Sequence, residues 1–192
     1  MKKLVIFFDN APSFHKEGTI EDIAKFNDIL LIHLPLKNDY MHFSEVYMKN
    51  SYFDKKRLKV NPKLSHKDIL TKIKDFLDLK LNNRIYLEIK IIYSFIDISR
   101  LNLVRKLISY CNQYSKYTYA LPLYEPIRLN DIYVIPRLIK IFFSLIYQKT
   151  RINPKDIYVF SSLNSFVYKL FFRNIYITPY KKIYKDQILN NK

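Results

Sequence analysis

The sequence has a single glycine, a single cysteine and no tryptophan. With 8 Pro and 49% hydrophobic residues, it is not a low-complexity or disordered segment, which would have too little apolar surface to offset the entropy lost on folding. The lone Cys111 cannot form an intrachain disulfide and has no CxxC companion, which excludes a disulfide-stabilised secreted scaffold and a cysteine-based zinc site. We therefore expect a folded protein in a reducing compartment.

Long apolar runs are also missing. The run after the first two lysines covers only Leu4–Phe8, which is too short for the apolar core of a signal peptide. Residues 138–147 are interrupted by Lys140 and fall well short of the roughly 20 residues that a membrane span requires. We expect no membrane partner and no secretion, and a nuclear location in a eukaryote or a cytoplasmic one otherwise.

Acidic residues are scarce relative to basic ones. The chain has 33 Lys and Arg against 17 Asp and Glu, which gives a formal net charge of +16. Such an imbalance attracts polyanions, and nucleic acid is the first partner to consider. The basic connector at residues 49–63 suits contact with DNA phosphates, or equally a solvated face. An AT-rich coding sequence would also raise the lysine content, so charge alone does not decide.

The opening of the chain is predicted to form a strand, a short helix and a second strand. Leu4–Phe8 is a continuous apolar run closed by Asp9, which is typical of a strand buried on both faces. Thr19 and Asp22 form a capping pattern for a helix, and Asp28–His33 is the next apolar strand. Such units nearly always take a parallel, right-handed crossover, so both strands should end at the same edge of one sheet.

Two further helices are predicted after the second strand. Apolar residues recur at helical spacing between Phe43 and Met48, which places Glu45 in the early turns of a helix at the same sheet edge as Asp9. Ser65 opens a capping-box pattern for another helix. His33, His42 and His66 are assigned no chemistry, because none has Cys or His partners at metal-binding spacing.

The second half is predicted to be mainly helical with two short strands. The four elements expected there are helices at Leu101–Tyr110 and Val134–Tyr147 and strands at Asp156–Phe160 and Ile175–Thr178. Residues 85–98 are apolar enough for a strand or a buried helix, and periodicity does not separate the two. A domain boundary is placed at residues 79–83, which divides the chain into residues 1–80 and an α-rich basic region, residues 81–192.

The segment at residues 5–12 reads VIFFDNAP, a hydrophobic strand that ends in Asp-Asn-Ala, and His15 follows it. After a predicted helix and strand, a Leu-Pro at residues 34–35 opens a stretch that closes on Glu45. There are 35 residues between Asp9 and Glu45. This order and spacing resemble the end of the catalytic core of the mariner-type DDE transposases, a group of DDE superfamily endonucleases.

The resemblance implies an α/β fold in which residues 1–80 are the C-terminal part of a ribonuclease H-like domain, a partial β-α-β-α segment followed by a mainly α-helical extension. It implies that Asp9 and Glu45 are catalytic and hold Mg²⁺ or Mn²⁺ for in-line attack on a DNA phosphodiester. The family's first catalytic Asp lies on an earlier strand. Asp97 stands in a segment with some likeness to that region, but it follows the last acid and fits only a rearranged core.

The function implied is that of a transposon-derived DNA endonuclease and strand-transfer protein, reduced to an incomplete and inactive remnant with DNA as its partner. The alternative is a non-catalytic, basic nucleic-acid-binding protein. Two parallel strands cannot enclose a core and leave exposed edges. We therefore expect them to pair with the second half of the chain, with another copy in a homo-oligomer, or with a second chain.

Overall fold

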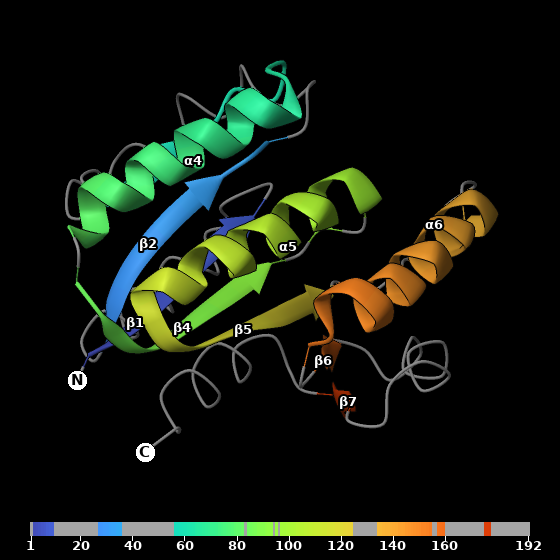
Figure 1. Ribbon diagram of the computed structural model, residues 1–192. Coiled ribbons are helices and arrows are strands. Elements are labelled where there is room, and N and C mark those ends of the chain that lie inside the picture. Colours follow the sequence, from blue (N-terminus) through green and yellow to red (C-terminus); the bar gives the residue numbers. More distant parts are fainter. Residues whose placement is uncertain are drawn as a thin grey trace.

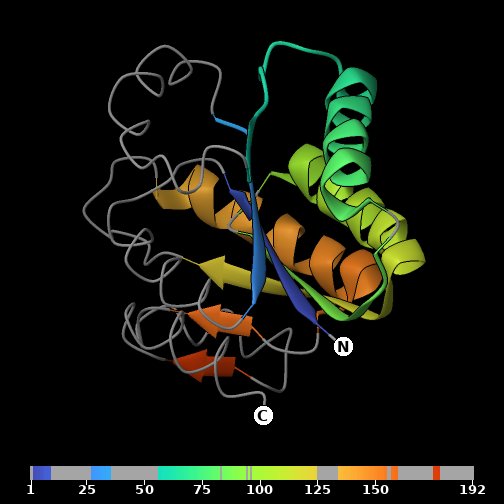
Figure 2. The same cartoon turned by 90° about the vertical axis from the view of Figure 1, so that its left-hand side faces the viewer.

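The computed structural model describes residues 2–9, 27–35, 56–82, 84–93, 95, 97–124, 134–154, 157–159 and 175–177 (Figures 1 and 2). Within these residues, seven strands and three α-helices form an α/β fold. The predicted helices near residues 19–26 and 43–48 lie outside them. None of the helices in the described part of the chain is long and apolar enough to cross a membrane.

The first third of the chain supplies three strands: β1 (Lys3–Asp9), β2 (Asp28–His33) and β3 (Arg57–Lys59). The predicted parallel pairing of the first two is confirmed, with Leu4 opposite Asp28 and Asp9 opposite His33. Their runs are apolar throughout because both faces of a parallel sheet are covered. β3 extends the sheet beyond β2 from a segment that the sequence indicated only as a basic connector.

The second half of the chain completes the same sheet. It contributes β4 (Tyr86–Tyr93), β5 (Ser115–Tyr124), β6 (Ile157–Val159) and β7 (Ile175–Ile177). The strand order is β3-β2-β1-β4-β5-β6-β7, and each neighbouring pair is parallel. The predicted helical extension after residue 80 is therefore wrong. That part of the chain supplies four strands of the sheet, and β4 pairs directly with β1.

Three helices connect these strands: α4 (His66–Leu81), α5 (Ile98–Cys111) and α6 (Val134–Tyr147). Two short turns accompany them, the 3₁₀ turn η1 (Asn112–Tyr114) and the π-helical turn η2 (Gln148–Ile152). Figure 1 shows the helices on one face of the sheet, with α5 in contact with both α4 and α6. Each of these helices connects a strand to another that lies nearer the β7 edge of the sheet. Right-handed crossovers that run in one direction place their helices on the same face.

The core lies between this helical layer and the sheet. Leu4, Ile6 and Phe8 of β1 alternate towards it, and Ile89 and Ile91 of β4 do the same. Val5 and Phe7, on the opposite face of β1, are also buried. Burial on both faces explains why the apolar run of β1 is continuous rather than alternating.

The order of the strands reverses direction at one position in the sheet. Strands β1, β2 and β3 progress in one direction across the sheet, whereas β4 to β7 progress in the other. The direction reverses between β1 and β4, so the connections that leave these two neighbours diverge. In open parallel sheets, ligands bind outside the carboxyl ends of the strands at such a switch point.

Candidate functional site

The two predicted metal ligands are only partly covered by the described residues. Asp9 is the last residue of β1, at the carboxyl edge of the sheet, as the sequence predicted. Glu45 and His15 lie outside the described residues, so the proximity of Asp9 and Glu45 stays a prediction. Among the side chains that the structure describes, no group of three or more His, Cys, Asp or Glu residues is placed to hold a metal ion.

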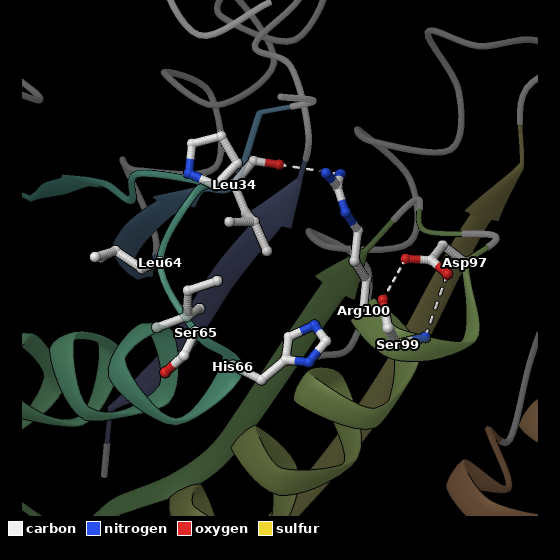
Figure 3. A pocket seen from close by; sticks show the side chains of 9 residues that line it. Leu34, Leu64, Ser65, His66, Asp97, Ser99 and Arg100 are labelled. Carbon is white, nitrogen blue, oxygen red and sulfur yellow. Dashed lines mark hydrogen bonds between the residues drawn. The ribbon is translucent and has the colours of Figure 1, made fainter. Parts of the chain in front are cut away.

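A cavity of about 330 Å³ opens at this same carboxyl edge (Figure 3). It lies between the first turns of α4 and α5, next to the end of β2. The residues that line it are Leu34, Pro62, Leu64, Ser65, His66, Ile69, Asp97, Ser99 and Arg100. We call it the carboxyl-edge pocket.

The pocket is built from the connections that follow three strands. Leu34 comes directly after β2, and Pro62 to Ser65 lead from β3 into α4. Asp97 to Arg100 lead from β4 into α5. Because all strands of a parallel sheet end at one edge, these three connections meet although they are distant in the sequence.

Two helix N-termini face the pocket, and each has a capping side chain. Ser65 Oγ accepts a hydrogen bond of 3.2 Å from the backbone N–H of Asp68, and Asp97 Oδ1 accepts one of 3.3 Å from that of Ser99. A cap satisfies only part of the first turn, whose remaining N–H groups have no acceptor within the helix. The aligned peptide dipoles add partial positive charge at both helix starts.

Arg100 joins α5 to the end of β2. Its Nη1 donates to the carbonyl oxygen of Leu34 at 3.1 Å, and its Nη2 donates to that of Pro35 at 3.0 Å. The guanidinium also lies over the ring of the buried Phe95, 5.5 Å from its centroid. These contacts hold a permanent positive charge in the wall of the pocket.

His66 lies on the opposite wall. Figure 3 shows its imidazole projecting from the first turn of α4 towards the start of α5, where Ser99 and Arg100 lie. The side chain is exposed, unlike His33, which is buried at the end of β2. No motif in the sequence assigned chemistry to His66, because its neighbours in the pocket come from distant segments.

The pocket therefore combines a fixed cation, an imidazole, two helix starts and one carboxylate. Arg100 and the helix starts favour an anionic group such as phosphate. The Asp97 carboxylate is an acceptor for hydroxyl donors, and it already accepts from the Ser99 hydroxyl. The sequence did indicate the cap at Ser65, but it contained no signal that Arg100 would line the same pocket.

The single cysteine takes no part in this site. Cys111 is fully buried at the end of α5, and burial raises the pKa of its thiol to about 12. A thiol with such a pKa carries almost no nucleophilic thiolate at neutral pH. Cys111 is therefore a packing residue.

Known proteins do not identify this site. No protein-family model matches the sequence, and no curated protein or solved structure matches it significantly. The chemistry of the pocket is therefore inferred from its geometry and charge.

Proposed function

We propose that this protein binds a nucleotide in the carboxyl-edge pocket. The observation that carries the proposal is the position of the pocket, at the carboxyl ends of the strands and beside the reversal of strand order. In open parallel α/β sheets this is the general place for ligands, because the diverging connections leave a crevice there. A volume of about 330 Å³ is at the lower end of the usual range for small-molecule sites.

The polar groups of the pocket suit the two ends of a nucleotide. The Arg100 guanidinium and the starts of α4 and α5 provide positive charge for a phosphate. Asp97 and Ser99 provide hydrogen-bonding groups for ribose hydroxyls. The net charge of +16 further supports a phosphate-bearing ligand, because it raises the local concentration of anions and speeds their association.

Replacing His66 by glutamate tests this proposal, since the new carboxylate would face the bound phosphate. We expect His66→Glu to weaken nucleotide binding about tenfold or more, which corresponds to roughly 1.4 kcal/mol. The measurement is titration calorimetry with the four ribonucleoside monophosphates. The side chain is exposed, so the fold should persist.

The matched control is Lys67→Glu on the adjacent, exposed residue of α4, which does not line the pocket. This control removes more positive charge than His66→Glu does, but it should leave the affinity within about twofold, because exposed charges are screened by salt. Equal losses in both variants would reveal a general charge effect. Absence of binding by the wild-type protein to all four nucleotides would overturn the proposal.

A second candidate function is metal-dependent DNA chemistry of the DDE type, on a ribonuclease H-like fold. It is supported by Asp9, which ends β1 at the carboxyl edge as the transposase resemblance requires. Asp97 follows β4, the other neighbour of β1, so its segment reaches that edge as well. The metal ions would stabilise charge on a DNA phosphodiester during in-line attack, with Asp9 and Glu45 as ligands.

Metal binding distinguishes this candidate. We expect Mn²⁺ binding, followed by electron paramagnetic resonance, to be lost in Asp9→Asn and in Glu45→Gln, because each substitution removes one carboxylate ligand. The control Asp75→Asn changes an exposed acid of α4 and should bind Mn²⁺ like the wild type. Unchanged Mn²⁺ affinity in Asp9→Asn would refute the candidate. DNA binding that survives both substitutions and metal removal would support the non-catalytic, basic alternative.

A further inference from the structure

A second hollow adjoins the carboxyl-edge pocket. It measures about 530 Å³ and is lined by His66, Ile98, Ser99, Asn102, Arg105, Tyr147 and Arg151. His66 and Ser99 line both hollows, so the two share a wall at the start of α5. We call this second hollow the arginine groove.

The permanent charges that line the arginine groove have one sign. They come from two separate elements, Arg105 from α5 and Arg151 from η2, and His66 of α4 lies beside them. No acidic residue lines it within the described part of the chain. Like charges gathered in one hollow repel each other, and an anion placed between them relieves that repulsion.

Two lining residues of the groove are hydrogen-bonded to each other, and its guanidinium groups are accessible. Tyr147 Oη donates a hydrogen bond of 3.3 Å to Asn102 Oδ1, which links the end of α6 to α5. Arg151 is exposed and Arg105 is partly buried, so both remain within reach of solvent. The planar guanidinium can bind two phosphate oxygens at once, which makes arginine well suited to binding phosphate groups.

We propose that the arginine groove binds the distal phosphate of a nucleoside diphosphate whose first phosphate lies in the carboxyl-edge pocket. This inference rests on the proposed nucleotide-binding function and specifies its ligand. Because His66 and Ser99 line both hollows, one ligand can contact both. The groove thus makes the site selective for diphosphates over monophosphates.

The test compares ribonucleoside monophosphates with the corresponding diphosphates by titration calorimetry. The wild-type protein should bind the preferred diphosphate at least about tenfold more tightly than its monophosphate. The double variant Arg105→Ala/Arg151→Ala should lose this preference and retain the monophosphate affinity. The control Lys106→Ala/Lys149→Ala removes the same charge from neighbouring exposed lysines outside the groove and should keep the preference.

Each other outcome has a separate meaning. Equal wild-type affinities for monophosphate and diphosphate would overturn this inference and leave the nucleotide-binding function intact. Loss of the preference in the lysine control as well would also overturn it, because the effect would then come from net charge. Binding of neither class by the wild type would overturn both proposals. Matching far-UV circular dichroism spectra of the variants would show that the fold is preserved.

Discussion

Replacing Phe8 by alanine is expected to lower the free energy of unfolding by about 3–5 kcal/mol. Phe8 is 0% exposed and lies in β1, which is flanked on both sides by parallel strands. Its ring packs edge-on against Phe95, with 4.8 Å between the ring centroids. Removing the ring gives up buried apolar surface and leaves a cavity that the surrounding sheet can close only in part.

A loss of this size is a large fraction of the roughly 5–15 kcal/mol that stabilises a typical domain. Urea unfolding followed by far-UV circular dichroism measures it, since the chain has no Trp for fluorescence. The control is Leu79→Ala on α4, because Leu79 is 73% exposed and its truncation should change stability by no more than about 0.5 kcal/mol. Similar effects of the two substitutions would contradict the central position of β1.

Replacing Gln148 by alanine is expected to cost about 2–4 kcal/mol of stability. Gln148 begins η2 and is 0% exposed. Its Oε1 accepts a hydrogen bond from Tyr93 Oη, and its Nε2 donates one to Ser144 Oγ, both at 2.9 Å. The alanine variant removes both of these buried hydrogen bonds and leaves a cavity in their place, and each loss is costly in a buried site.

A double-mutant cycle isolates the Tyr93–Gln148 interaction. The cycle compares the wild type, Tyr93→Phe, Gln148→Met and the double variant. The double variant removes both polar partners and largely keeps their shapes, so it should lose less stability than the two single variants together. Urea denaturation of the four proteins supplies the coupling energy. Strict additivity would mean that the two side chains do not depend on each other, contrary to the buried network between β4 and η2.

Several elements were predictable from local patterns. The apolar runs of β1 and β2 and the Ser65 cap of α4 depend on neighbouring residues, and the structure confirms each. Within residues 85–98, Tyr86–Tyr93 form β4 and Ile98 begins α5, so a strand and the start of a helix share this range and no single period describes it. β5 was not predicted, because Pro122 lies inside it and a proline within an apolar run argues against a central strand.

The candidate site was less predictable than the fold. The placement of Asp9 at the carboxyl edge followed from the β-α-β pattern alone. The carboxyl-edge pocket, however, requires Leu34, His66 and Arg100 to meet across more than 60 residues of sequence, as the hydrogen bond from Arg100 to Leu34 illustrates. No local spacing records such a contact.

The sequence by itself determined the basic charge, the α/β class and the secondary structure of seven elements, because these depend on composition and on short-range periodicity. The seven elements are β1, β2, β6, β7, α4, α5 and α6. Only the tertiary structure decided that β4 pairs with β1 and that the strand order reverses between them. Strand order is set by which apolar faces and edges bury each other best across the whole chain. The carboxyl-edge pocket and the arginine groove are consequences of that long-range choice.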